Sequence, residues 1–117
     1  MDYDAARTYL LAMPEAVEDF PFGIETAVFK VRDRMFATLG FINGMASMNL
    51  KCNPDEALAL RDIFPAVRPG YHMNKRHWNT LTLGGRLPNA LIAELIRHSY
   101  DLVVTSLPKK LRAEITQ

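Results

Sequence analysis

Three β-type segments joined by two tight turns constrain this chain more than any other feature. Residues 27–32 and 35–41 are rich in β-branched and aromatic types, and Asp33-Arg34 between them is short enough for a hairpin. Asn43-Gly44 is a strong signal for a two-residue turn. The segment Met45–Lys51 then alternates apolar and polar side chains. This stretch therefore predicts an antiparallel meander with one buried face.

Three helical segments accompany the meander. The first covers residues 3–13, where apolar side chains recur at spacings of three and four. The second starts at Asn53-Pro54-Asp55-Glu56, in which Asn is a good N-cap, Pro suits the first helical position and Glu completes a capping pattern. It ends near Phe64. The third and longest covers residues 88–107, and the basic residues 109–112 follow it with room for one more helical turn.

The order of these segments predicts the fold class. Two shorter β-type segments, residues 67–73 and 78–83, lie between the second and third helices, and residues 15–23 form a loop. Grouped strands with segregated helices are typical of α+β proteins with an antiparallel sheet. We expect an α+β fold in which an antiparallel β-sheet of about five strands packs against helices on one face. The expected order is helix, three strands, helix, two strands, helix.

Length and composition indicate one globular domain spanning residues 1–117. Of the 117 residues, 49% are hydrophobic and 23% are charged, which is ordinary for a folded domain. Cys52 is the one cysteine, so an intramolecular disulfide is excluded and a cysteine-based zinc site is not expected. The first residues lack the pattern of a signal peptide, and the apolar runs are too short to span a membrane. We therefore expect a cytoplasmic protein with no membrane partner.

Charge is distributed unevenly although the formal net charge is only +1. Residues 1–25 carry six carboxylates and one Arg, whereas residues 63–93 carry four cations and no carboxylate. A long acid-free segment favours contact with an anionic partner. The middle of the chain is therefore the first place to look for a binding surface.

Four segments resemble the MmcQ/YjbR family of small bacterial proteins. In chain order they are Asp19-Phe20-Pro21-Phe22-Gly23, Asn49-Leu50-Lys51-Cys52-Asn53-Pro54, the thirteen-residue block Arg68–Thr80, and His98-Ser99-Tyr100-Asp101-Leu102-Val103. The resemblance covers nearly the whole chain, and the thirteen-residue block is its most specific part. It implies a fold like that of the frataxin homologue CyaY. It also implies a role in binding DNA through wing-like elements around the sheet.

The segment Lys75-Arg76-His77-Trp78-Asn79 is the candidate DNA-binding site. Arg76 would bond a phosphate bidentately, Lys75 would act as a point charge, and Trp78 would stack on a base or sugar. His77 and Asn79 would shape or extend that surface. The alternative is structural, with Trp78 as a core aromatic and Asn79 bonded to turn backbone. Further cations join the site if the fold brings them to the same face: Lys51, Arg86, Lys109 and Lys110.

Other functions are less well supported by the residues. No paired-carboxylate, nucleophile–base or phosphate-loop motif is readable, so we expect neither an enzyme nor a cofactor. The spacing of the three His residues and Cys52 matches no zinc pattern, so no metal site is expected. Cys52 precedes a helix N-terminus, which lowers a thiol pKa, but a small buried residue is the plainer interpretation.

Two alternatives to DNA binding stay open. The first is a protein- or small-ligand-binding module in which the thirteen-residue block is structural. The second is a frataxin-like iron binder that uses the Asp and Glu residues of the first 25 positions.

Overall fold

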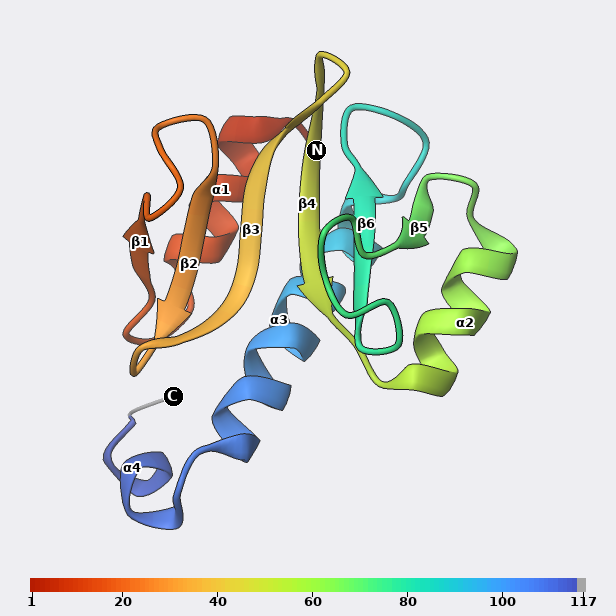
Figure 1. Ribbon diagram of the computed structural model, residues 1–117. Coiled ribbons are helices and arrows are strands. Elements are labelled where there is room, and N and C mark those ends of the chain that lie inside the picture. Colours follow the sequence, from red (N-terminus) through yellow and green to blue (C-terminus); the bar gives the residue numbers. More distant parts are fainter. Residues whose placement is uncertain (116–117) are drawn as a thin grey trace.

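The structure, a computed structural model, describes residues 1–115 and contains one six-stranded antiparallel sheet (Figure 1). The strand order across the sheet is β1-β2-β3-β4-β6-β5. The α+β prediction is confirmed. The strands are β1 (Val17–Asp19), β2 (Ala27–Val31), β3 (Arg34–Ile42), β4 (Met45–Lys51), β5 (Val67–Pro69) and β6 (Trp78–Thr82). The helices are α1 (Tyr3–Leu11), α2 (Pro54–Ile63), α3 (Asn89–Ser106) and α4 (Lys109–Glu114).

The central meander follows from its two turns. Asn43 and Gly44 adopt φ angles of 51° and 79° between paired residues Ile42 and Met45. Positive φ at both central positions is the geometry of the type I′ turn, which matches the twist of a hairpin. The β2–β3 turn is Arg32-Asp33, with φ angles of 49° and 64°, one residue earlier than the sequence predicts. The reason is that Arg34 pairs with Val31 as the first residue of β3.

Two strand boundaries differ from the prediction. Residues 15–23 were expected as loop, but Val17–Asp19 pair antiparallel with β2 and make a sixth strand. This edge strand is held by side chains from elsewhere: Arg7 bonds Glu18 at 2.7 Å and Lys30 bonds Asp19 at 3.1 Å. The expected strand over residues 67–73 ends at Pro69, because the chain turns at Gly70 to fold over β6.

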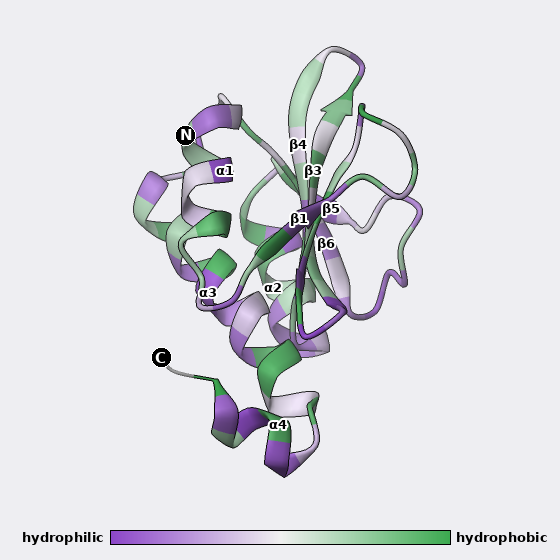
Figure 2. Cartoon of the chain, turned by 90° about the vertical axis from the view of Figure 1, so that its left-hand side faces the viewer, coloured by the Kyte–Doolittle hydropathy of each residue, from purple (hydrophilic) through white to green (hydrophobic). Residues whose placement is uncertain are grey.

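The core lies between the sheet and the helices α1 and α3, which cover one face (Figure 2). Alternation along the strands sends Ala37, Leu39, Met48 and Leu50 into this core. The hydroxyl of Ser99 on α3 donates to the Phe36 carbonyl at 2.6 Å and accepts from the Lys51 amide at 2.8 Å, which fixes α3 across β3 and β4. α2 lies beyond the β5 edge (Figure 1). The expected packing of helices on one face is confirmed for α1 and α3, whereas α2 lies at the edge of the sheet.

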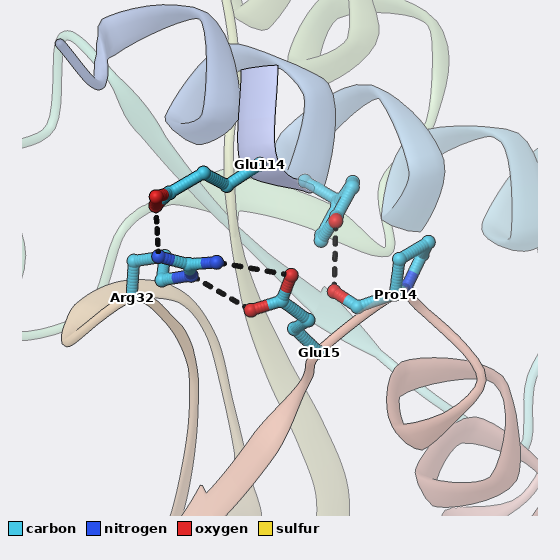
Figure 3. Close-up of polar contacts among 5 residues, drawn as sticks. Pro14, Glu15, Arg32 and Glu114 are labelled. Atoms are coloured by element: carbon cyan, nitrogen blue, oxygen red, sulfur yellow. Dashed lines mark hydrogen bonds and ion pairs between the residues drawn. The ribbon is translucent and has the colours of Figure 1, made fainter. Parts of the chain in front are cut away.

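The basic segment after α3 forms α4, as its composition allows. An Arg32-centred cluster fastens α4 to the β2–β3 turn (Figure 3). Arg32 bonds Glu15 at 2.7 Å and Glu114 at 3.0 Å. Within residues 1–115, none of the helices has the length and apolar character needed to cross a membrane.

Candidate functional site

The middle of the sheet face opposite the helices carries several uncharged polar side chains. Register places Thr38 beside Asn49 and Asn49 beside Thr80, so these side chains share that face across β3, β4 and β6. Gly40 and Ser47 are paired in the same way. No helix covers this face in the described part of the chain, which explains why small polar residues occupy it (Figure 2). We call it the open face.

The open face contains a hollow with a volume of about 440 Å³. One wall comes from Phe22 in the β1–β2 loop, and the other comes from Tyr71, His72 and Met73 in the β5–β6 loop. Phe22 is 79% exposed and Tyr71 is 52% exposed, so both rings are accessible to a partner. The Tyr71 and His72 rings lie 4.0 Å apart between centroids. The hollow therefore has aromatic walls, and its floor combines the polar residues Thr38, Asn49 and Thr80 with apolar residues of β3, namely Met35, Phe41 and Ile42.

Hydrogen bonds to the floor position the Tyr71 wall. The Tyr71 amide donates to Thr80 Oγ1 at 2.8 Å. The Thr80 hydroxyl donates in turn to Asn49 Oδ1, and Asn49 Nδ2 donates to the Tyr71 carbonyl at 3.5 Å. Through this closed set of hydrogen bonds, the side chains of Asn49 and Thr80 hold the β5–β6 loop in place. His72 completes the wall with a left-handed φ of 58°, a conformation that His tolerates better than most residues.

Gly70 allows the loop to lie directly on β6. Its amide donates to the Trp78 carbonyl at 2.9 Å. A Cβ at this position would lie 2.8 Å from the Trp78 Cβ and 3.0 Å from the Trp78 carbonyl oxygen. Only Gly avoids these contacts without movement of the backbone. The Trp78 side chain shares its face of β6 with Thr80.

Trp78 and Asn79 are structural residues. Trp78 is 9% exposed and Asn79 is 2% exposed. Arg61 from α2 donates to Asn79 Oδ1 at 2.7 Å and also to the Lys75 carbonyl, and Asn79 donates to the Ala57 carbonyl at 3.4 Å. This placement corrects the expectation that both side chains form part of a binding surface, because burial leaves them no access to a partner.

Four cations lie on the strands and in the loop that flank the hollow on its β5–β6 side. Lys51 lies two residues after Asn49 on β4, and Arg68 is paired with Thr80, so both are on the open face. Lys75 and Arg76 are exposed in the loop that carries Tyr71. None of the four forms an ion pair with a described carboxylate. We call Lys51, Arg68, Lys75 and Arg76 the cation border.

Hydrogen bonds within the β5–β6 loop fix its backbone next to Lys75 and Arg76. Asn74 Oδ1 accepts from the amides of Arg76 and His77 at 2.9 and 3.3 Å, a side-chain turn typical of Asn. The Lys75 ammonium donates to the Gly70 carbonyl at 3.0 Å, which leaves two of its three donors for another partner. His77 is half-buried, and its carbonyl accepts from the Cys52 amide at 2.7 Å.

Arg86, Lys109 and Lys110 are not brought to this border. Arg86 follows the C-terminal end of β6, next to Phe64 and Pro65, whereas Lys75 and Arg76 precede its N-terminal end. Lys109 and Lys110 lie on α4, which is fastened to the β2–β3 turn, away from β6 and α2 (Figure 1). Three of the nine candidate residues therefore lie elsewhere on the molecule.

Comparison with known proteins places this geometry in a family. The YjbR family model matches residues 11–102. The chain belongs to the YjbR family. It is 36% identical to Escherichia coli O157:H7 YbdF over 92% of this chain and 88% of that protein. It is 34% identical to Escherichia coli K12 YjbR over 93% of this chain and 92% of that protein.

Solved structures agree with this assignment. The crystal structure of Deinococcus radiodurans DR2400, described as a DUF419 domain, matches with a TM-score of 0.89 and 38% identity, covering 97% of this chain and 86% of that one. A Pseudomonas syringae crystal structure matches with a TM-score of 0.77 and 29% identity, covering 87% of this chain and 98% of that one. The fold described above is therefore that of solved proteins of similar sequence.

Three carboxylates of the acidic N-terminal region of this YjbR-family chain form ion pairs. Bonds from Arg32, Arg7 and Lys30 hold the pKa values of Glu15, Glu18 and Asp19, respectively, below their ordinary range. Asp2 accepts from the Ala5 amide as the cap of α1. Among the described residues, no group of three or more His, Cys, Asp or Glu side chains could hold a metal ion. These pairings give Glu15, Glu18 and Asp19 a structural role in holding β1 and the β2–β3 turn.

Cys52 is buried, and burial raises the pKa of its thiol to about 11. A thiol with that pKa is almost entirely protonated at neutral pH, so it is a poor nucleophile. The position before α2 does not lower the pKa, since desolvation is the larger effect. The interpretation of Cys52 as a small core residue fits this family member.

Sequence reasoning missed the aromatic walls. Phe22 and Tyr71 both lie inside the segments that carry the family resemblance, but the sequence indicated only a loop for residues 15–23 and a strand for residues 67–73. An aromatic residue next to Gly or Pro in a polar loop is a usable signal, because such a loop has little core to receive it.

Proposed function

We propose that this protein binds DNA through its open face and acts by binding, without catalysing a reaction. One observation carries the proposal: four cations without carboxylate partners border a hollow whose walls are exposed aromatic rings. Cations without a carboxylate partner attract an external anion, and a nucleic acid offers phosphates next to flat aromatic bases. The proposal keeps DNA as the partner and moves the contact surface from Trp78 and Asn79 to the open face.

The cation border suits phosphate contacts. Arg68 and Arg76 carry planar guanidinium groups that bond two phosphate oxygens at once, whereas Lys51 and Lys75 supply point charges. Acidic residues lie on the other side of the hollow, since Asp19 is on β1 and Glu25 is in the β1–β2 loop. Phosphates would therefore follow the β5–β6 side of the open face.

The strength of binding follows from the number of cations. Each phosphate neutralised contributes about 0.9 to the slope of log K against log salt for duplex DNA and about 0.7 for a single strand. Four contacts give a slope of about −3 to −4 and weak binding at physiological salt. Binding is best measured from low salt upward.

The test is fluorescence anisotropy of a labelled DNA with three proteins. The wild-type chain is compared with Arg68→Glu/Arg76→Glu, which reverses two charges of the border. The matched control is Lys109→Glu/Lys110→Glu, which makes the same change in net charge on α4. We expect the first variant to lose at least tenfold in affinity while the control binds close to wild type.

Two results would contradict the proposal. Absence of binding by the wild-type chain even at low salt removes DNA as the partner. Equal losses in both variants show that the effect is one of net charge, which removes the open face as the site.

One observation favours a second function, that of a protein- or small-ligand-binding module. The hollow of about 440 Å³ lies within the range of small-molecule sites, roughly 300–1,000 Å³. A ligand of this kind would bind with little salt dependence, because the lining residues include no Lys, Arg, Asp or Glu.

A further inference from the structure

We infer that the hollow of the open face receives unpaired bases, so that the protein binds single-stranded DNA in preference to duplex. This inference rests on the proposed function, because it assumes that the open face binds DNA. It adds the form of the DNA and assigns a role to Phe22 and Tyr71.

Charge separates the hollow from its border. The thirteen residues that line the hollow include no Lys, Arg, Asp or Glu, whereas Lys51, Arg68, Lys75 and Arg76 are beside it. An uncharged interior disfavours a phosphate and accepts a neutral group, since burying a charge without a partner is costly. A cationic border favours phosphates. A strand with its bases turned inward and its backbone along the border matches both conditions.

The walls provide stacking surfaces. Phe22 and Tyr71 stand on opposite sides of the floor with most or half of their surface exposed. Base–aromatic stacking tolerates any base, because every base has a π face. The Tyr71 ring contacts the His72 ring, with the two ring planes tilted by 53°.

The floor supplies hydrogen-bonding groups to a base edge. Asn49 and Thr80 are already bonded to each other and to the Tyr71 loop. Thr38, by contrast, lines the hollow and forms no hydrogen bond with another described side chain or carbonyl through its hydroxyl. Bases in a duplex present their faces to their neighbours and their edges to their partners, so only an unpaired base reaches this floor and these walls.

Within residues 1–115, no helix lies on the open face where it could enter a duplex groove. A protein reads the major groove with a helix or a two-stranded ribbon. α1 and α3 lie behind the sheet, and the exposed part of α2 carries Asp55, Glu56 and Asp62. The helices therefore offer duplex DNA no groove contact beside the open face, and the cation border offers contacts to its phosphates.

The experiment compares three labelled probes by fluorescence anisotropy at low salt. They are an oligothymidylate of about 12 nucleotides, within the site size of a single-strand-binding fold, an abasic strand of equal length, and a duplex of equal length. We expect the oligothymidylate to bind about tenfold more tightly than the other two. An abasic strand that binds as well as the oligothymidylate overturns the inference, and so does a duplex that binds as well.

Variants of the walls give a second readout. Tyr71→Ala and Phe22→Ala should each weaken oligothymidylate binding about tenfold with an unchanged salt slope, while Tyr71→Phe keeps the affinity. Tyr9→Ala removes an exposed aromatic ring from the helix side and serves as the matched control. Because Phe22 and Tyr71 lie in different loops, a folding defect in one variant leaves the other informative. Wild-type affinity in both alanine variants overturns the inference.

The two proposals fail in different ways. If all three probes bind equally and Arg68→Glu/Arg76→Glu abolishes binding, the open face binds DNA but takes no base. If no probe binds, the proposed function itself is wrong.

Discussion

The amide of Tyr71 donates a hydrogen bond of 2.8 Å to Thr80 Oγ1, and this contact joins the aromatic wall of the hollow to its floor. Thr80 Oγ1 also donates to Asn49 Oδ1. A single hydroxyl on β6 therefore sets the position of a loop that carries an exposed ring. The site depends on a strand residue as much as on the loop.

Replacing Thr80 tests this dependence. Thr80→Val keeps the shape but removes the hydroxyl, so Asn49 Oδ1 and the Tyr71 amide lose a partner. We expect a loss of about 1–3 kcal/mol in the free energy of unfolding and faster hydrogen exchange at the Tyr71 amide. Thr82→Val, on the same face of β6 and half-buried, is the control and should change stability by less than about 0.5 kcal/mol. Equal effects of the two substitutions would contradict the assigned role.

Gly70 should tolerate no side chain. Gly70→Ala places a Cβ 2.8 Å from the Trp78 Cβ, so the backbone of the loop must move. We expect a loss of about 1–3 kcal/mol in urea unfolding. Gly85→Ala meets nothing within 4 Å and is the matched control, for which we expect little change. Wild-type stability of Gly70→Ala would show that the loop adapts freely to β6.

Arg61 should be a structural cation. Arg61→Ala removes the donor to Asn79 Oδ1, and Asn79 is buried, so the amide keeps an unpaired acceptor. We expect a loss of about 1–3 kcal/mol in thermal or urea unfolding. Arg86→Ala, in the exposed loop after β6, should be close to wild type. If Arg61→Ala left the free energy of unfolding unchanged, the hydrogen bond to buried Asn79 would not be the reason that Arg61 is needed.

The ion pair between Arg7 and Glu18 should make the stability of the fold depend on pH. The hydrogen bond from Arg7 lowers the pKa of Glu18 from its ordinary value near 4.5. A lowered folded-state pKa stabilises the fold above the ordinary value, and the contribution is lost as the pH falls through the folded-state pKa. Glu18→Gln should therefore be less stable than wild type near neutral pH, with a difference that shrinks below about pH 4.5.

The control for this pair is Glu25→Gln, since Glu25 is exposed and has no ion pair among the described residues. Its stability should follow that of wild type at each pH. A Glu18→Gln difference that stays constant down to low pH would mean that the carboxylate charge is not what Arg7 stabilises.

Local signals predicted the centre of the fold. Met45–Lys51 is a strand with the predicted boundaries because Asn43-Gly44 fixes the turn and alternation fixes the buried face. Asn53 caps α2 as its neighbours indicate. Such features depend on residues close in sequence, so a single sequence suffices for them.

Long-range contacts explain what the sequence could not predict. β1 is only three residues long, and its pairing is supported by Arg7 and Lys30 from other elements. Asn79 was interpreted as a surface amide, but its burial depends on Arg61 from α2. The candidate site also differs from the one expected at residues 75–79, because the hollow is formed by Phe22 together with Tyr71, which are far apart in the chain. These outcomes depend on tertiary packing, which neither residue type nor spacing contains.

The most direct test of the account is to locate the DNA on the protein by NMR. Uniformly ¹⁵N-labelled wild-type chain is titrated with oligothymidylate at low salt, and amide shifts are followed. The account predicts the largest changes at Thr38, Asn49 and Tyr71, with the amides of α1 and α3 close to their free positions. Changes concentrated on α4, or none at saturating DNA, would contradict the claim that the open face is the binding surface.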